Sequence, residues 1–140
     1  MKICVIGMIY KSISYLDFMM YNINKYCTSE LHDISYNIIA NDANKNVLEH
    51  LKINNINHII YNDSNPNDYY INRIYRAWNY GGFNTDCDVI IFINSDMAFT
   101  PKWIDNLIKK CIGPDKHHYI TVELKEIKSK EIVIIRVKQS

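Results

Sequence analysis

Short, continuously apolar runs alternate along this chain with longer segments whose apolar residues recur at helical spacing. An apolar run without alternation suits a strand buried on both faces, as in a parallel sheet covered by helices. The runs predict strands at residues 3–8, 36–40, 57–61 and 89–93. The helical spacing predicts helices at residues 14–26, 44–52, 68–79 and 100–110. Four strand–helix units in succession predict an α/β fold with a mostly parallel sheet, flanked by helices and joined by right-handed crossovers.

Residues with special backbone or capping properties mark the ends of several of these elements. Gly7 allows a close backbone approach at the end of the first strand. Ser14 is expected to cap the first helix, and Gly81-Gly82 to end the third. Thr100-Pro101 supplies a cap and a first-turn proline for the fourth helix.

The segment after the fourth helix changes character. Residues 119–124 and 131–137 are two strand-like runs joined by residues 125–130, which predicts a C-terminal antiparallel hairpin or two edge strands. The sequence contains no linker, internal repeat or low-complexity tract. We therefore expect a single domain that covers residues 1–140.

The composition excludes several classes of function. The apolar fraction of 48% and the charged fraction of 22% are typical of a soluble globular protein. The net charge is +1, from 16 basic and 15 acidic residues, so neither nucleic acid nor a membrane surface is an expected partner. No apolar run is long enough for a signal peptide or a membrane span. These features predict a soluble, cytoplasmic protein.

The spacing of the cysteines is also typical of a cytosolic protein. They are widely spaced, with no C-x-x-C pair and no histidine at finger spacing, so a zinc site is not supported. They fit reduced thiols in a protein of the cytosol. The four are Cys4, Cys27, Cys87 and Cys111.

The fourth apolar run is the most informative feature, because it ends on Asn94-Ser95-Asp96. Ligands of open α/β sheets bind at the carboxyl ends of the strands. A short carboxylate at such an end coordinates a hard divalent cation, which in turn holds a diphosphate. Asp96 is therefore a candidate metal ligand. The same residue types also serve as ordinary turn and helix-start residues, so a purely structural role is the alternative.

Four motifs occur in an order that is similar to a known family. Asn41-Asp42 follows the second strand, and Asn72-Arg73 lies on a helix about twenty residues before Asn94-Ser95-Asp96. Thr100-Pro101 and a further helix come next. This order resembles a family 2 glycosyltransferase of the GT-A fold, a Rossmann-like fold. The resemblance covers residues 1–110, and the order and spacing of the motifs carry it.

The resemblance implies a nucleotide-sugar donor site with bound Mn²⁺ or Mg²⁺. A divalent ion neutralises the charge that the leaving nucleoside diphosphate gains as the glycosidic bond breaks. Asp96 would be the direct metal ligand, and Asn94 and Ser95 would contact the nucleotide-sugar. Asn94 stands where the family's D-x-D motif has its first acidic residue, which departs from the pattern, because an amide brings no charge. Metal affinity is therefore expected to be weaker than with two carboxylates.

Four further residues receive roles from the same resemblance. Asp42 would accept a hydrogen bond from the nucleotide base, or else act as a turn or helix cap. Arg73 would pair with a phosphate, or else lie on the solvated face of its helix. Asn72 would contribute beside Arg73 to donor binding, and Tyr10 would line the base pocket by stacking.

Family members usually continue for another hundred or more residues, which build the acceptor site and supply the general base. The donor half is expected here, and no catalytic base is assigned, although Glu123 or Glu126 is available. Three explanations stay open: a truncated gene product, a minimal enzyme whose acceptor site comes from a partner protein or self-association, and a binding module without efficient transfer. A flavodoxin-like nucleotide- or partner-binding domain is a further alternative, disfavoured because no Gly-rich phosphate loop is present.

Overall fold

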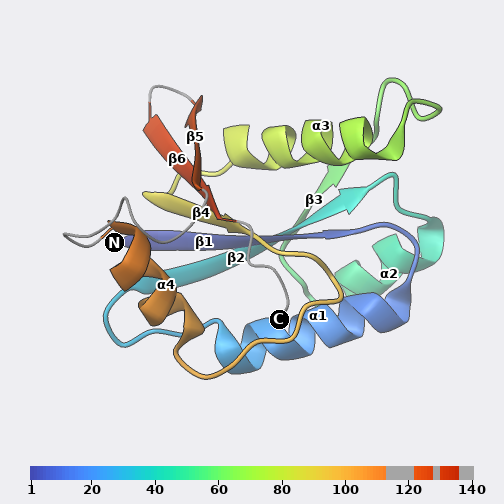
Figure 1. The fold of residues 1–140 in the computed structure, drawn as a ribbon. Coiled ribbons are helices and arrows are strands. Elements are labelled where there is room, and N and C mark those ends of the chain that lie inside the picture. Colours follow the sequence, from blue (N-terminus) through green and yellow to red (C-terminus); the bar gives the residue numbers. More distant parts are fainter. Residues whose placement is uncertain (113–121, 128–129, 136–140) are drawn as a thin grey trace.

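The computed structural model describes residues 1–112, 122–127 and 130–135. They form an α/β fold around one sheet with the strand order β3-β2-β1-β4-β6-β5 (Figure 1). The strands are β1 (Lys2–Ile9), β2 (Asp33–Asn41), β3 (His58–Tyr61), β4 (Val89–Phe92), β5 (Val122–Ile127) and β6 (Lys130–Ile135). The helices are α1 (Ile13–Tyr26), α2 (Lys45–Ile53), α3 (Tyr70–Phe83) and α4 (Trp103–Ile112).

Strands β1 to β4 are all parallel, which confirms the predicted parallel sheet. The register pairs Ile9 of β1 with Ala40 of β2, and Ile6 of β1 with Phe92 of β4. A backbone bond from Ile93 N–H to Ile6 C=O extends the β4 pairing by one residue. The carboxyl ends of these strands therefore share one edge of the sheet, as the Rossmann-like arrangement requires.

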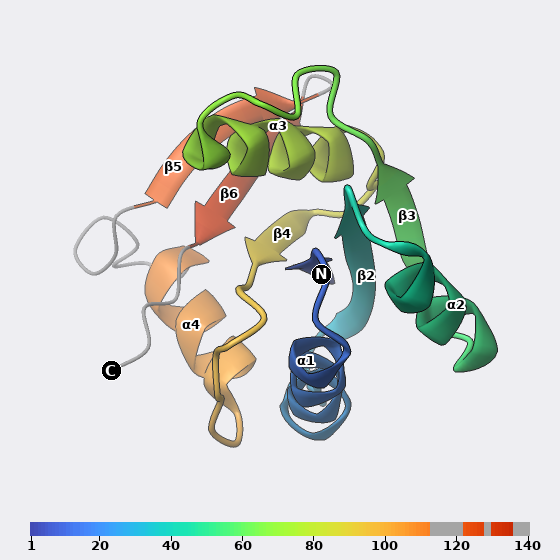
Figure 2. The same cartoon turned by 90° about the vertical axis from the view of Figure 1, so that its right-hand side faces the viewer.

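Helices cover both faces of the sheet, and two buried clusters fill the space between the layers. Helices α1, α2 and α4 lie on one face and α3 lies on the other (Figures 1 and 2). Ile3 and Val5 of β1 belong to the larger cluster beneath α1, α2 and α4. Cys4 and Ile6 belong to the smaller cluster beneath α3. Burial on both faces explains why the strands are continuously apolar.

The first two helices begin at side-chain caps. Ser12, and not the predicted Ser14, caps α1: its Oγ accepts a hydrogen bond of 3.2 Å from Tyr15 N–H. Ser14 lies inside the first turn, where its Oγ is 3.0 Å from Ser12 Oγ. Asn44 caps α2 by accepting a bond of 2.9 Å from Val47 N–H.

Helix α3 runs through Gly81 and Gly82 to Phe83, so the prediction that these glycines end the helix is wrong. The reason is packing. A Cβ atom on Gly81 would lie 2.5 Å from Ile39 Cδ1 of β2, so a larger residue would force the Ile39 side chain or the helix to shift. Gly7 has the same role inside β1, because its Cβ would lie 2.5 Å from Met19 Sδ of α1.

Helix α4 begins later than predicted, at Trp103. Lys102 has a φ of 61°, which is incompatible with a right-handed helix. Thr100 and Pro101 therefore form a turn before the helix, in which Thr100 C=O accepts a bond of 3.3 Å from Trp103 N–H.

The C-terminal strands extend the sheet beyond β4. Strand β6 meets β4 in parallel at the pair Ile90–Ile134, and β5 pairs with β6 antiparallel. Residues 119–121 and 136–137 of the two predicted strands lie outside the described residues. Residues 125–127 and 130, predicted as part of the connection, belong to β5 and β6. Within the described part of the chain, no helix is long and apolar enough to cross a membrane.

Candidate functional site

A cavity of about 480 Å³ lies at the carboxyl edge of the parallel strands. Its volume falls within the ordinary range for small-molecule sites. Five predicted site residues line it, namely Tyr10, Arg73, Asn94, Ser95 and Asp96. They come from the loop after β1, the first turn of α3 and the loop after β4, so only the folded chain brings them together.

Sequence reasoning assigned no site role to the other polar and aromatic residues of the cavity wall. Asn41 closes the wall at the end of β2, and Tyr15 and Tyr70 contribute from the first turns of α1 and α3. Trp78 lines the wall from α3 and stacks on Phe92 with ring centroids 5.1 Å apart. Asn41 adjoins the predicted Asp42 and ends a strand, which was the available signal for it.

Asp42 does not line the cavity, but it acts directly on a residue that does. Its Oδ2 accepts a hydrogen bond of 2.8 Å from Arg73 Nη2, and its Oδ1 accepts one of 2.9 Å from Asp63 N–H. Both carboxylate oxygens therefore serve the chain's own donors. The backbone of Asp42 is left-handed, with a φ of 47°, a conformation that aspartate tolerates better than most residues. Its turn role is thus present in the structure.

Arg73 is not on a solvated face of its helix. Its side chain is only 18% exposed, and the ion pair with Asp42 holds it against the cavity. The hydrogen bond to Asp42 is the main cause that raises the pKa of Arg73 above its ordinary value. Its Nε is buried without a hydrogen-bond partner among the described residues. The guanidinium is therefore fixed in direction and retains donor capacity.

Asn72 precedes Arg73 in the sequence, but its side chain does not face the cavity. It is exposed and does not line the cavity, and its Nδ2 is 3.5 Å from Asp68 Oδ1. The structure therefore separates Asn72 from the other predicted site residues.

Tyr10 has two cations near its ring. Lys11 Nζ is 4.7 Å and Arg73 Cζ is 5.7 Å from the centroid of its ring, which is the range of cation–π contacts. The pKa of the Tyr10 hydroxyl is lowered, chiefly by a hydrogen bond with Lys11 and then by one with Arg73. The residue is 42% exposed, so part of it is accessible to a ligand.

The Asn94-Ser95-Asp96 segment is a tight turn on a buried base. Met97 N–H donates to Asn94 C=O at 3.4 Å, and Ile93 and Met97 on either side are 1% and 4% exposed. Those two anchors leave Ser95 half-buried and Asp96 exposed at the cavity. The turn interpretation and the site interpretation of these residues are therefore compatible.

The donor set for a cation is small. Among the described residues there is no group of three or more His, Cys, Asp or Glu side chains that could hold a metal. The cavity offers the Asp96 carboxylate with the neutral oxygens of Asn94 and Ser95. One carboxylate is sufficient for Mg²⁺ when substrate phosphates complete its coordination, so these residues fit an ion that arrives with a diphosphate.

Asn41 is the buried polar side chain of the cavity. It is 5% exposed, its Nδ2 is 3.4 Å from Met8 Sδ, and its Oδ1 has no hydrogen-bond partner among the described residues. An unpaired buried carbonyl oxygen costs free energy unless a donor reaches it. A ligand with an N–H or O–H group would satisfy Asn41 Oδ1.

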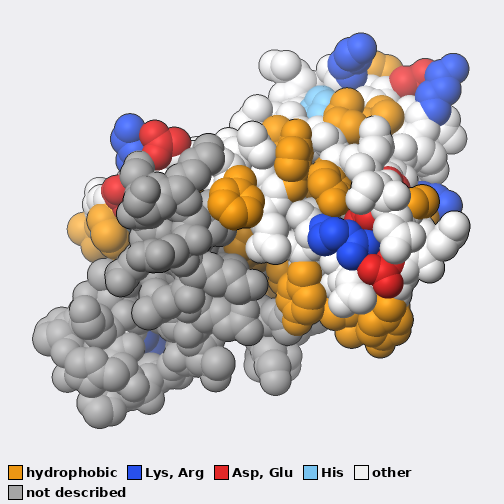
Figure 3. Space-filling model, turned by 90° about the horizontal axis from the view of Figure 1, so that it is seen from above, with side chains coloured by type: hydrophobic (Ala, Val, Ile, Leu, Met, Phe, Trp, Pro, Cys, Tyr) orange, Lys and Arg blue, Asp and Glu red, His pale blue; other side chains and the backbone are white. Residues whose placement is uncertain are grey.

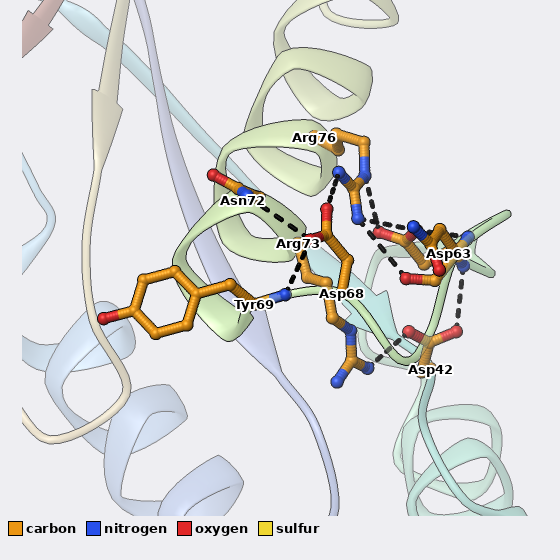
Figure 4. Close-up of polar contacts among 8 residues, drawn as sticks. Asp42, Asp63, Asp68, Tyr69, Asn72, Arg73 and Arg76 are labelled. Carbon is orange, nitrogen blue, oxygen red and sulfur yellow. Dashed lines mark hydrogen bonds and ion pairs between the residues drawn. The ribbon is translucent and has the colours of Figure 1, made fainter.

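A second ionic network lies next to the Asp42–Arg73 pair, and sequence reasoning missed it. Arg76 donates from Nε and Nη2 to the two oxygens of Asp63, both at 3.0 Å, and from Nη1 to Asp68 at 2.8 Å (Figure 4). The network ties α3 to the loop after β3, and Asp63 N–H links it to Asp42. The available signal was the spacing of Arg73 and Arg76, almost one helical turn apart in a chain with three arginines.

A larger hollow of about 890 Å³ lies elsewhere, at the opposite edge of the sheet. It is bordered by Met1, the 28–32 loop and residues of α4. It contains none of the predicted site residues, and its Asp105 carboxylate is already bonded by Ser29 Oγ at 2.5 Å.

No protein-family model, curated protein or solved structure matches this chain. The geometry of the smaller cavity therefore carries the functional conclusions that follow.

Proposed function

We propose that this chain is a glycosyltransferase-like domain that binds a nucleotide-diphospho-sugar through a divalent metal and transfers the sugar to an acceptor. The observation that carries the proposal is the joint presence of Tyr10, Arg73 and Asp96 on one cavity at the carboxyl edge of a parallel sheet. An aromatic face, a fixed cation and a carboxylate match the base, the diphosphate and the metal of such a donor. In this proposal the fold is GT-A-like, with β5 and β6 as its C-terminal antiparallel pair.

Asp96 would hold Mn²⁺ or Mg²⁺, with Asn94 and Ser95 binding directly or through water. The ion would supply the neutralising charge for the leaving diphosphate. Arg73 would donate to a phosphate oxygen or to the base from its fixed position, and the exposed face of Tyr10 would stack on the base. Asn41 Oδ1 would accept a hydrogen bond from the donor, which would remove the cost of its unpaired burial.

Titration calorimetry with UDP, GDP, ADP and CDP, each with and without Mn²⁺, tests the donor site. We expect at least one nucleotide to bind, with an affinity that rises when Mn²⁺ is added. Asp96→Ala should remove that rise and weaken nucleotide binding in Mn²⁺ by at least about tenfold, because the carboxylate that binds the ion is lost. The turn should keep its fold, since Asp96 is exposed. Asn94→Asp should strengthen metal-dependent binding by adding a second carboxylate.

Asp33→Ala is the matched control, since Asp33 is an exposed aspartate at the opposite end of β2. It should leave nucleotide affinity and its metal dependence unchanged. Nucleotide affinity that is indifferent to both Mn²⁺ and Asp96→Ala would contradict the metal claim. Failure of every nucleotide to bind would contradict the donor site itself.

A domain that holds the nucleotide-sugar without efficient transfer is the second candidate. It is favoured by one observation: among the described residues that line the cavity, Asp96 is the one carboxylate, and the proposal assigns it to the metal, so no lining carboxylate is left to act as a base. Release of nucleoside diphosphate from the bound sugar nucleotide, with and without acceptors, separates the candidates. Turnover on the order of 1 per second with a defined acceptor supports the enzyme, and binding without turnover supports the holding domain.

A further inference from the structure

Two tyrosines border the cavity from opposite layers of the fold. Tyr15 lies in the first turn of α1, and Tyr70 is the first residue of α3, so they approach the cavity from the two faces of the sheet. Their exposed fractions are 54% and 60%, although both line the cavity. We call Tyr15 and Tyr70 the tyrosine rim.

Each rim tyrosine has one local contact. Tyr15 N–H donates to the Ser12 cap, which fixes the start of α1 beside the cavity. Tyr70 packs edge-on against Tyr69, with ring centroids 4.9 Å apart and ring planes at 61°. The Tyr69 ring points away from the carboxylates of the ionic network (Figure 4). Tyrosine offers a large, rigid contact surface with few rotatable bonds, so binding to such a rim costs little side-chain entropy.

The rim has the chemistry of a surface that binds a ring with both apolar and polar parts. Each tyrosine has an apolar ring face and a hydroxyl at its edge. On the face above α3, the hydrophobic side chains of the described residues appear as separate groups between polar atoms (Figure 3). A lipid or an apolar peptide would need a contiguous apolar patch, whereas separate aromatic faces suit small apolar surfaces on a polar ligand.

We propose that the tyrosine rim binds the acceptor, and that this acceptor is a neutral carbohydrate whose sugar rings stack on Tyr15 and Tyr70. A sugar ring carries C–H groups on one face and hydroxyl groups on its edge, which matches a tyrosine ring and its hydroxyl. This inference rests on the proposed function, because the same cavity would hold the donor against Tyr10, Arg73 and Asp96. The acceptor would then enter at the exposed mouth of the cavity, next to the donor sugar.

The test is a calorimetric titration of the full chain with neutral tetrasaccharides of β-1,4-linked glucose, N-acetylglucosamine and galactose. Each titration is run with Mg²⁺ and the nucleoside diphosphate that binds best. We expect at least one oligosaccharide to bind. The double variant Tyr15→Ala/Tyr70→Ala should weaken it about tenfold or more, because two stacking contacts are lost. Tyr15→Phe/Tyr70→Phe should keep most of the affinity, because the ring faces remain.

Tyr21→Ala is the matched control: Tyr21 is 55% exposed on the same helix α1 but does not line the cavity. It should leave oligosaccharide affinity unchanged, and thermal unfolding should show that all variants stay folded. The tyrosine variants should also keep the affinity for Mg²⁺ and nucleotide.

Each contrary result has a distinct meaning. If nucleotide binds and no oligosaccharide does, the rim proposal is wrong while the donor site stands. If the alanine variants lose nucleotide affinity, the rim belongs to the donor site and the proposal is also wrong. If no nucleotide binds, the proposed function fails, and oligosaccharide titration without nucleotide decides whether the rim binds carbohydrate at all.

Discussion

Arg73 donates a hydrogen bond of 2.8 Å from Nη2 to Asp42 Oδ2, joining the first turn of α3 to the end of β2. The two side chains are 18% and 19% exposed, so water competes little for either charge. Arg73 lines the cavity and Asp42 does not. Asp42 is therefore a positioning residue, which sets the direction of the arginine that a ligand would meet.

The first prediction follows from this pair. If Asp42 acts through Arg73, the losses of nucleotide affinity in Asp42→Asn and Arg73→Gln should not add in the double variant. We expect a coupling free energy of about 1 kcal/mol, typical of contacting residues in one network. Titration calorimetry of the wild type, two single variants and the double variant measures it.

The Lys45–Glu49 ion pair is the control for that cycle, since its side chains are 88% and 56% exposed on α2. Its substitution to Gln at both positions should change nucleotide affinity little. Strictly additive losses at Asp42 and Arg73 would mean that Asp42 contacts the ligand independently.

The second prediction concerns the order of metal and nucleotide binding. Because the cavity offers Asp96 as its acidic ligand with neutral Asn94 and Ser95, metal alone should bind weakly. Titration of Mn²⁺ followed by electron paramagnetic resonance should show little bound ion until nucleoside diphosphate is added. Asn94→Asp should raise the affinity for Mn²⁺ alone. Tight Mn²⁺ binding in the absence of nucleotide, retained in Asp96→Ala, would locate the ion elsewhere.

The third prediction is a pH dependence of stability. Hydrogen bonds from Arg76 are the main cause that lowers the pKa values of Asp63 and Asp68 below their ordinary 3.8. A carboxylate whose folded pKa is depressed stabilises the fold above its unfolded pKa, and this stabilisation is lost as the pH falls through the folded pKa. The wild type should therefore lose stability steeply below about pH 4.

Arg76→Gln removes the cation from both carboxylates. The variant should unfold at a lower temperature near neutral pH, and its unfolding temperature should fall less steeply below about pH 4. Thermal unfolding followed by circular dichroism from about pH 3 to 7 measures both effects. Lys52→Gln, an exposed lysine of α2, is the control and should follow the wild-type curve. An Arg76→Gln curve parallel to the wild type would refute the role of the network.

The fourth prediction tests the close contact of α3 with the sheet. Gly81→Ala adds helix propensity worth about 1 kcal/mol, but its Cβ would lie 2.5 Å from Ile39 Cδ1 in the core. Overpacking of this kind costs about 1–3 kcal/mol, so the variant should be less stable than the wild type. Denaturant unfolding measures the change.

Ile39→Val removes the Cδ1 atom that the new Cβ meets. Alone it should cost about 0.5–1.5 kcal/mol, as buried Ile→Val substitutions do. In Gly81→Ala it should cost clearly less, or restore stability, because it relieves the contact. Simple addition of the two losses would show that the glycine is not required by this contact.

The apolar runs determined the strands, because a strand covered on both faces must be apolar on both. Ile3, Val5, Cys4 and Ile6 show this directly, with alternate residues buried under different helices. The element ends were harder to predict from local signals. Glycine favours helix termini, so the sequence predicts a helix end at Gly81. In the structure, the close approach of Ile39 of β2 to α3 explains why glycine occurs at this position. No local pattern contains that contact.

The candidate site, too, could be predicted from the sequence only in part. The sequence placed Asn94-Ser95-Asp96 at a strand end, and parallel strands bring their carboxyl ends to one edge. Tyr10 and Asp96, which follow β1 and β4, therefore meet at the cavity as the order of elements requires. The sequence could not determine which face of α3 Arg73 occupies, because that depends on how the helix is rotated against the sheet.

What the sequence alone determined is the succession of strands and helices and the edge where their polar ends gather, because both follow from periodicity and from parallel connection. What only the tertiary structure decided is how the side chains at that edge are paired. Asp42 accepts a hydrogen bond from Arg73, and Asn72 lies near Asp68 outside the cavity. Asn41 is buried, and its Oδ1 has no hydrogen-bond partner among the described residues. These pairings depend on distances between residues far apart in the chain, and packing of α3 on the sheet sets those distances.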